Sequence, residues 1–336
     1  MSRGRIWLFP IEPIEERYSE QWLRWWGDGL KAAGFELRII MGARLNGGIG
    51  AGQFLDIYDT NYFKATQLAV FAQRLRSGEV KDGDVVFLLD AWNAEVTSLA
   101  YMRDAGGHKF KLAGFWHAGT YDPWDFLTQR GLDRWAAPIE SAWCTLLDRS
   151  YVATRFHAEL LIRERGLPQT RVRVVGLPVM HQEWQQYRRP WSERPPCVVF
   201  PHRLAPEKAP EEFAYIESEY RRRWPDDPVQ FVRTKDVWST KHAYYSLLGS
   251  SRVAVSTARQ ETFGIAMVEA QSLGCWCIAP NRLSYSETME PEALYVNLDD
   301  AVILVRGALA RNCPSPYDET RWTSTVARVA DDLAGL

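Results

Sequence analysis

The feature that most constrains the fold is the regular recurrence of short apolar runs separated by stretches of helical period. Such runs occur in both halves of the chain, from RIWLF, DVVFLLD and KLAGFW to CVVF, VAVS and CWCIAP. They are typical of strands buried on both faces, and strands that alternate with helices form parallel sheets. Two of the intervening stretches end in a glycine, Gly34 and Gly78, which is suited to cap a helix C-terminus. The sequence therefore predicts an α/β fold built of βαβ units.

The chain divides at a change in composition. Residues 179–196, VMHQEWQQYRRPWSERPP, replace the alternating pattern with Pro, Arg, Gln and Trp, which is typical of a linker. A length of 336 residues also suits about two domains. We therefore expect two doubly wound, Rossmann-like domains at 1–178 and 197–315. Residues 316–336 have the pattern of an amphipathic terminal helix, with the option of packing back on the N-terminal domain.

Charge and cysteine usage exclude several classes of protein. Lys and Arg number 40 and Asp and Glu 42, so the net charge of −2 provides no whole-molecule field for a polyanion, and nucleic-acid contact depends on local patches. Five cysteines without a C-x-x-C pair indicate neither a disulfide framework nor a zinc site, so we expect a reducing cytoplasm. No apolar run reaches the roughly 18 residues of a membrane span, and no membrane partner is expected. The 15 tryptophans suit either apolar packing or stacking surfaces for flat ligands.

The strongest chemical signal is the run RQETFGIAMVEAQSLGCWCIAP at residues 259–280. Glu261 and Glu269 stand eight positions apart, a little over two helical turns. Both carboxylates face one cleft if Glu261 precedes the helix and Glu269 lies on its second turn. Two such acceptors suit a polyhydroxylated ligand, and the amides of Gly264 and Ile265 at the helix N-terminus suit phosphate. The alternative is a solvated amphipathic helix with two incidental acids, against which the small and apolar neighbours count.

A second signal is the run VVFPHRLAPEKAPEEF, in which a predicted strand ends at Phe200 and Arg203 and Lys208 follow in the loop. Two fixed cations at the carboxyl edge of a sheet suit a diphosphate whose charge grows as a bond breaks. The alternative is a basic loop with surface ion pairs.

From His202 to about Tyr295 the chain resembles the C-terminal half of GT-B glycosyltransferases of family 4 type, whose signature is this Glu-x7-Glu element preceded by an Arg…Lys pair. The resemblance implies that the two domains face a central cleft and that a UDP- or GDP-sugar is the donor. It also implies transfer with retention of anomeric configuration, without a metal or a tightly bound cofactor. It assigns donor binding to the following residues: Arg203, Lys208, Glu261, Thr262, Phe263, Gly264, Ile265 and Glu269.

Two finer resemblances concern the acceptor. The stretches FPHRLAPEKAPEEF and YYSLLGSSRVAVSTARQETFGIAMVEAQSLGCWCIAPNRLSYSE are similar to tRNA-queuosine mannosyltransferases. In the N-terminal half, IEPIEERYSEQW, GQFLDIYDTNYFKATQ and FWHAGTYD are similar to phage-type glycosyltransferases of hydroxymethylated pyrimidines in DNA. The favoured acceptor is therefore a 5-hydroxymethylpyrimidine in DNA, in the host cytoplasm for a phage-encoded enzyme. Queuosine tRNA, a glycan or a small molecule are the alternative acceptors, and a sugar-nucleotide epimerase or a catalytically silent binding protein are alternatives of another class. A monomer and a homodimer both stay open.

The acceptor side is predicted from residues beyond strand ends of the N-terminal half. His117 follows an apolar strand, and by the resemblance it faces the sugar and joins Arg203, Lys208 and Glu261 in the catalytic set. Asp122 is either an acceptor-activating base or a local turn residue. Tryptophans at strand ends are candidates to flank a base, and the glycine-rich stretch 47–52 is either a ligand loop or a surface loop. The acceptor-side candidates are Gly47, Gly48, Trp92, Trp116, Tyr121, Asp122 and Trp124.

Overall fold

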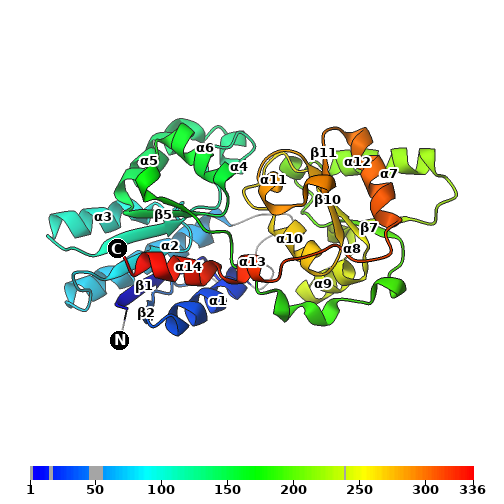
Figure 1. Ribbon diagram of the computed structural model, residues 1–336. Coiled ribbons are helices and arrows are strands. Elements are labelled where there is room, and N and C mark those ends of the chain that lie inside the picture. Colours follow the sequence, from blue (N-terminus) through cyan, green and yellow to red (C-terminus); the bar gives the residue numbers. More distant parts are fainter. Residues whose placement is uncertain (1–2, 15–17, 45–55, 238–239) are drawn as a thin grey trace. The chain divides into compact units, whose positions relative to one another are not determined.

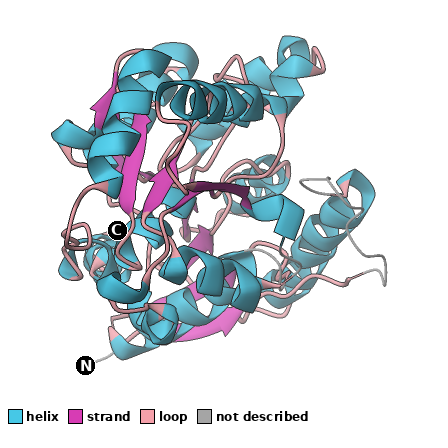
Figure 2. Cartoon of the chain, turned by 90° about the vertical axis from the view of Figure 1, so that its right-hand side faces the viewer, coloured by secondary structure: helices cyan, strands magenta, loops and turns pink. Residues whose placement is uncertain are grey.

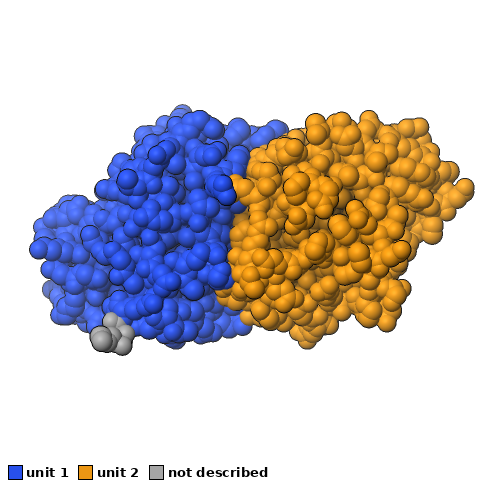
Figure 3. Space-filling model, in the orientation of Figure 1, with its two compact units in different colours: residues 1–178, 324–336 blue, residues 179–323 orange. Residues whose placement is uncertain are grey.

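The computed structural model describes residues 3–14, 18–44, 56–237 and 240–336. The chain forms two compact units (Figure 3). Unit 1 consists of residues 1–178 and 324–336, and unit 2 of residues 179–323.

The described residues of unit 1 form a parallel sheet of six strands in the order β2-β1-β3-β4-β5-β6. Its strands are β1 (Arg5–Phe9), β2 (Glu36–Ile39), β3 (Val85–Leu88), β4 (Lys111–Phe115), β5 (Arg149–Val152) and β6 (Val172–Val174). The helices are α1 (Tyr18–Ala32), α2 (Ile57–Arg76), α3 (Glu95–Ala105), α4 (Phe126–Gln129), α5 (Asp133–Leu146), α6 (Arg155–Arg165) and α14 (Thr325–Leu333), with the short η1 (Gln169–Arg171). The sheet is doubly wound, since the strand order reverses at β1.

Helices cover both faces of this sheet because successive strand residues point to opposite sides. Trp7, Val86 and Leu112 share one core with residues of α2, α3, α5 and α6. On the other face, the rings of Phe87 and Phe115 meet Trp26 of α1 edge-on at 5.4 and 6.0 Å. Helix α14 lies beside α1 (Figure 1). The three tryptophans of α1 are buried, which is apolar packing and not a stacking surface: Trp22, Trp25 and Trp26.

The described residues of unit 2 form a second parallel sheet, of five strands in the order β11-β10-β9-β7-β8. Its strands are β7 (Cys197–Phe200), β8 (Gln230–Arg233), β9 (Val253–Val255), β10 (Trp276–Pro280) and β11 (Leu294–Tyr295). The helices are α7 (Pro210–Arg223), α8 (Thr234–Val237), α9 (Lys241–Ser250), α10 (Ile265–Ser272), α11 (Tyr285–Thr288), α12 (Leu298–Leu309) and α13 (Thr320–Thr323). Short 3-10 turns are η2 (His181–Glu183), η3 (Gln185–Tyr187), η4 (Trp191–Glu193), η5 (Pro206–Lys208) and η6 (Pro291–Ala293). Helices cover the strands (Figure 2), and β7, β9 and β10 are buried along their whole length.

The segment 179–196, expected to be a linker, is instead part of unit 2. Trp184 is buried and its indole nitrogen donates to Ser272 Oγ at 2.7 Å. The buried Arg194 guanidinium donates to the carbonyls of Ser251 and Leu273 at 2.9 and 2.6 Å. The linker prediction was wrong because a Pro- and Arg-rich composition indicates only that the backbone is irregular. In this segment the irregular backbone packs against unit 2.

The C-terminal segment divides at residue 323. Helix α13 belongs to unit 2 and α14 to unit 1, where Thr325 Oγ1 donates to the carbonyls of Val175 and Leu177 at 3.1 and 3.3 Å. The carboxylate of Asp332 accepts from the Tyr151 hydroxyl at 2.8 Å. Helix α14 is therefore fastened to the sheet by side-chain hydrogen bonds as well as by its apolar face.

Candidate active site

The predicted polar residues of unit 2 gather at the carboxyl edge of its sheet. His202, Arg203 and Lys208 follow β7, and Glu261 follows β9. Strands β7 and β9 pair in parallel, with Val198 opposite Val253. Because the carboxyl ends of neighbouring parallel strands lie at one edge, the two loops meet there, as is usual for ligand sites of such sheets.

Lys208 and Glu261 form an ion pair between these loops. The distance from Lys208 Nζ to Glu261 Oε2 is 3.0 Å, and Nζ also donates to the Gln260 carbonyl at 2.7 Å. The side chains are 12% and 17% exposed, so the pair is sheltered but open to a ligand. Burial raises the pKa of Glu261, but the Lys208 charge and hydrogen bond outweigh burial and hold the pKa at about 2. Glu261 is therefore a carboxylate that only accepts hydrogen bonds at neutral pH.

Backbone contacts hold the Lys208 loop in place. Thr257 Oγ1 donates to the carbonyls of Lys208 and Ala209 at 2.9 and 2.8 Å. Ala209 is buried in the left-handed region, with φ 48°, which few residues other than glycine adopt. Arg203 is half exposed, and its Nε donates to Glu207 Oε1 at 2.8 Å, one helical turn away. The Arg…Lys spacing thus places both cations at one edge of the sheet.

Helix α10 begins at Ile265, four residues after Glu261. Gly264, with φ 85°, is the N-cap, and Glu261 Oε1 accepts from the amides of Thr262 and Phe263 at 3.2 and 3.4 Å. The Phe263 side chain is buried against Trp322, at 4.9 Å between ring centroids, so it packs the core and only its backbone remains for a ligand.

Replacing Gly264 with alanine is expected to lower the free energy of unfolding by at least about 1 kcal/mol. The positive φ strains any L side chain, and a Cβ would lie 2.9 Å from Tyr285 Cε1. Gly307, inside α12, is the matched control, because a Cβ there meets open space. Gly307→Ala is expected to raise stability by about 0.5–1 kcal/mol. Urea unfolding measures both, and equal effects at the two positions would contradict the strained cap.

Glu269 lies on the second turn of α10, as its spacing predicted, but among the described residues no hydrogen bond joins it to Glu261 or Lys208. Its buried carboxylate accepts from the hydroxyls of Tyr244 and Tyr245 on α9, at 3.1 and 2.9 Å. Burial raises the pKa of Glu269, against the opposing charge of Lys241. Nothing in the spacing of the two tyrosines predicts this contact, because the sequence does not show that α9 faces α10.

A buried polar chain lies behind the ion pair. His202 Nε2 is 2.8 Å from Ser256 Oγ, which is 2.6 Å from the Tyr285 hydroxyl. Burial lowers the pKa of His202 to about 3, with the Lys208 charge acting in the same direction. The imidazole is therefore neutral at physiological pH, and it positions the loop without adding a cation to it.

The buried neutral His202 makes stability fall in acid. The unfolded histidine titrates near 6.5 and the folded one at about 3, so between these values the unfolded state binds more protons. This group alone is expected to cost about 2 kcal/mol between pH 7.5 and pH 5. Urea midpoints of the wild type and His202→Asn at both pH values measure it, because the variant lacks the group. Parallel pH dependence in the two proteins would contradict the burial of a neutral imidazole.

The acceptor-side candidates in unit 1 divide by burial. Trp116 is fully buried and donates to Ser150 Oγ at 3.1 Å, so its proposed stacking role was wrong. Tyr121 is also buried, with its hydroxyl 2.6 Å from His157 Nε2. Asp122 is buried, and its Oδ1 accepts from the Trp124 amide at 2.8 Å, which favours the turn role over an activating base.

The remaining candidates lie nearer the surface. Trp92 is half-buried, and its indole nitrogen donates to Glu140 Oε1 at 2.8 Å. Trp124 is half-buried as well, and His117 follows β4 at the carboxyl edge. Gly47 and Gly48 lie outside the described residues.

The arginines at the end of α7, residues 221–223, form a basic patch whose charges are paired with acidic side chains. Arg221 pairs with Glu217 at 2.8 Å and Arg222 with Glu219 at 2.7 Å, both on the same helix. Arginines that are already paired with glutamates attract the phosphates of a nucleic acid less strongly.

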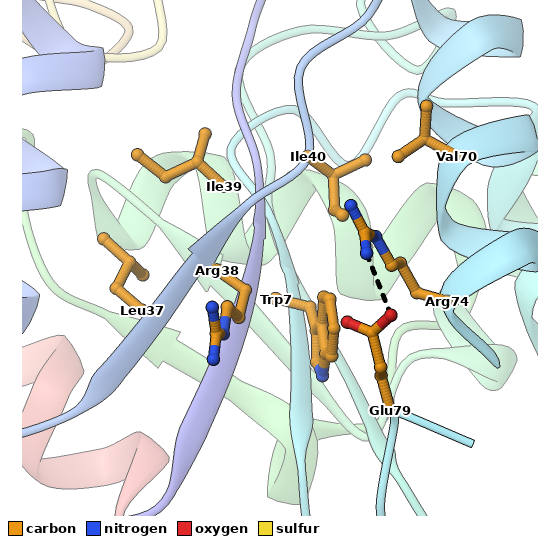
Figure 4. A pocket seen from close by; sticks show the side chains of 8 residues that line it. All are labelled: Trp7, Leu37, Arg38, Ile39, Ile40, Val70, Arg74 and Glu79. Carbon is orange, nitrogen blue, oxygen red and sulfur yellow. Dashed lines mark hydrogen bonds and ion pairs between the residues drawn. The ribbon is translucent and has the colours of Figure 1, made fainter. Parts of the chain in front are cut away.

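Unit 1 also contains a pocket of about 330 Å³ beside its edge strand, between β2 and α2 (Figure 4). The Arg74–Glu79 pair, 2.8 Å apart, lines one side. None of the residues predicted to carry chemistry lines it. In the part of the chain that the structure describes, no cluster of His, Cys, Asp and Glu is placed to hold a metal ion, and no helix has the length and apolar character of a membrane span.

Comparison with known proteins gives a short sequence similarity and an extensive structural one. No family model matches the chain. It is 35% identical over 89 residues to the tRNA-queuosine alpha-mannosyltransferase of Drosophila melanogaster, a match that spans 26% of this chain and 21% of that protein.

The structural similarity covers nearly the whole chain. Sucrose-phosphate synthase from Thermosynechococcus elongatus matches with a TM-score of 0.66 at 15% identity, over 99% of this chain and 94% of that one. The lipopolysaccharide outer core galactosyltransferase WaaB matches with a TM-score of 0.61 at 15% identity, over 98% and 96%. A glycosyltransferase from Rickettsia africae gives 0.59 at 11% identity, over 98% of both chains. The protein therefore has the two-domain fold of the GT-B glycosyltransferases.

Proposed function

We propose that this protein is a retaining glycosyltransferase that moves a sugar from a UDP- or GDP-sugar to a hydroxyl on a modified nucleobase. The observation that carries the proposal is the Lys208–Glu261 pair, with Arg203 beside it, at the carboxyl edge of the unit 2 sheet. This edge is where parallel α/β sheets bind nucleotides. A cation and a carboxylate in contact offer one group for a diphosphate and another for sugar hydroxyls.

The mechanism follows from the charges of these residues. Lys208 and Arg203 bind the donor diphosphate and stabilise the negative charge that grows on it as the bond from the anomeric carbon to the phosphate oxygen breaks. The acceptor hydroxyl attacks from the same face and gives its proton to that departing oxygen, so that configuration is retained. Glu261 accepts hydrogen bonds from the sugar hydroxyls, which its low pKa permits. No carboxylate nucleophile is required.

Glu269 is proposed to bind the ribose of the donor. Its carboxylate is held by Tyr244 and Tyr245, so a diol must either replace one tyrosine hydroxyl or use the remaining lone pairs. Because burial raises the pKa of Glu269, two hydroxyl donors in place of water help to keep it ionised.

The acceptor is proposed to be a 5-hydroxymethylpyrimidine in DNA, with tRNA queuosine as the alternative. The 89-residue similarity to a tRNA-queuosine alpha-mannosyltransferase supports a modified nucleoside as the acceptor. Taken alone, this similarity favours tRNA queuosine over DNA. An acceptor in duplex DNA must leave the base stack before its hydroxyl reaches a buried site. The cytoplasm is the proposed location, whether the protein acts as a monomer or as a homodimer.

A screen of labelled nucleotide sugars tests the proposal. UDP- and GDP-sugars are incubated with 5-hydroxymethylcytosine DNA, 5-hydroxymethyluracil DNA and bulk tRNA, and nucleosides are analysed by mass spectrometry. We expect one nucleoside to gain the mass of a sugar, and EDTA to leave the rate unchanged because Lys208 and Arg203 supply the positive charge. Donor isomerisation without transfer would instead identify an epimerase, and donor binding without turnover a silent binding protein. Full loss of activity in EDTA, restored by a divalent ion, would contradict metal independence.

A further inference from the structure

A second cluster of polar and charged side chains lies at the carboxyl edge of the unit 1 sheet. Asp90 comes two residues after β3, His117 comes two residues after β4, and Lys64 projects from α2. Strands β3 and β4 are parallel neighbours, with Leu88 opposite Gly114, so the loops that follow them lie together. Asp90 and Lys64 are not among the site residues predicted from the sequence.

Lys64 holds Asp90 in a fixed position. Lys64 Nζ donates to Asp90 Oδ2 at 2.8 Å and to the Trp92 carbonyl at 2.7 Å, and the Trp92 amide donates to Asp90 Oδ1 at 3.1 Å. The side chains of Lys64 and Asp90 are 14% and 23% exposed. Each carboxylate oxygen keeps a second lone pair after these contacts, so Asp90 can still accept a hydrogen bond from a ligand.

His117 lies at the same edge. Its Nε2 is 2.6 Å from the Leu89 carbonyl, which only accepts, so Nε2 carries the proton. Burial lowers the pKa of His117, so the ring is neutral at physiological pH. The imidazole stacks on Phe115 at 5.1 Å between centroids.

The loops that carry these groups share one buried support. Glu140 Oε1 accepts from Trp92 Nε1 at 2.8 Å and from the Thr120 amide at 2.7 Å. One carboxylate thus connects the loop after β3 with the loop after β4. An edge that is fixed in this way and that carries the Asp90 carboxylate suits a ligand that brings hydroxyl groups.

We infer that Asp90, held by Lys64, binds a hydroxyl of the acceptor substrate. This inference rests on the proposed glycosyl transfer, in which the donor diphosphate lies on unit 2 and unit 1 is left to bind the acceptor. Asp90 accepts a hydrogen bond from the hydroxyl and holds its oxygen in place, while the proton still passes to the departing phosphate oxygen. Asp90 is therefore an acceptor-binding residue, with no proton transfer of its own.

The test compares Asp90→Asn with the wild type and with Asp104→Asn, whose side chain is an exposed carboxylate on α3 in the same unit. The probe is the nucleic acid that the wild type glycosylates in the screen, and three quantities are measured: kcat/KM for that acceptor, donor hydrolysis without acceptor, and the melting temperature. We expect Asp90→Asn to lower kcat/KM for the acceptor about 100-fold, since a hydrogen bond to a charged group is lost. Donor hydrolysis is expected to stay within threefold, and Asp104→Asn to match the wild type throughout.

Two results would overturn the inference. Unchanged transfer by Asp90→Asn would show that the carboxylate does not bind the acceptor, and an equal fall in hydrolysis and transfer would show that it binds the donor sugar. Lys64→Met keeps the test informative if the asparagine variant melts early, because it leaves the carboxylate in place and is expected to weaken acceptor binding in the same direction. A wild type that binds no nucleotide and modifies no acceptor would instead reject the proposed function itself.

Discussion

Lys208→Ala is expected to lower kcat about 100-fold, the effect of removing one preorganised donor from a charge that develops in the transition state. The ammonium group is sheltered, with 12% of the side chain exposed, so it acts on the donor diphosphate with little screening by water. Initial rates at saturating donor and acceptor measure kcat. Arg222→Ala is the control in the same unit, since this exposed cation pairs with Glu219 on the surface of α7.

Lys208→Ala removes a cation from the donor diphosphate, and it also leaves the Glu261 carboxylate without its ion-pair partner. A second variant separates these two effects. Glu261→Gln keeps the shape of the side chain and removes its charge, and Lys208 is retained. We expect this variant to weaken donor binding while keeping more of kcat than Lys208→Ala does. Calorimetric titration with the nucleotide sugar that serves as donor in the screen measures the first effect. A Lys208→Ala protein with wild-type kcat and an unchanged melting temperature would remove the assigned site.

Glu140→Ala is expected to lower the free energy of unfolding by about 3–5 kcal/mol, the usual cost of breaking a buried ion pair from one side. Glu140 is fully buried and Arg165 is 9% exposed, with 2.6 Å between Arg165 Nε and Glu140 Oε2. The substitution leaves this guanidinium without a carboxylate, and it also removes the acceptor of the Trp92 indole and of the Thr120 amide and hydroxyl. Urea unfolding followed by circular dichroism measures the loss.

Glu164→Ala is the matched control for Glu140. Its carboxylate lies on the surface of α6 and pairs with Arg163, whose side chain is 65% exposed. Surface pairs of this kind contribute about 0–1 kcal/mol. Similar losses in the two variants would show that the buried pair does not stabilise unit 1 more than a solvated one.

The sequence predicted the sheets because buried parallel strands need apolar side chains on both faces. The runs RIWLF, CVVF and CWCIAP became β1, β7 and β10 almost residue for residue. The spacing of Glu261 and Glu269 predicted their places before and within α10, since a helix start is a local property. The same composition reasoning failed at 179–196, because a Pro- and Arg-rich segment folds onto a domain whenever the domain offers partners for its polar groups.

Burial separated the aromatic candidates in a way that the sequence did not. Trp116 and Trp92 both follow strands, yet Trp116 is fully buried and Trp92 is half-buried. The alternation of side chains along a strand tells which face of the sheet a residue points to. How deeply that residue is buried depends on covering helices from distant parts of the chain. The Lys64–Asp90 contact was not predicted from the sequence for the same reason, because Lys64 is 26 residues away on α2.

By itself the sequence determined the α/β class, the parallel strands, and the residue types at the carboxyl edge of the second sheet, because these depend on local period and on spacing within one loop or helix. Only the tertiary structure decided that Lys208 meets Glu261, that Tyr244 and Tyr245 hold Glu269, and that Lys64 meets Asp90. Each of these contacts joins segments that strand order and helix packing bring together. The spacing of residues along the chain predicts neither strand order nor helix packing.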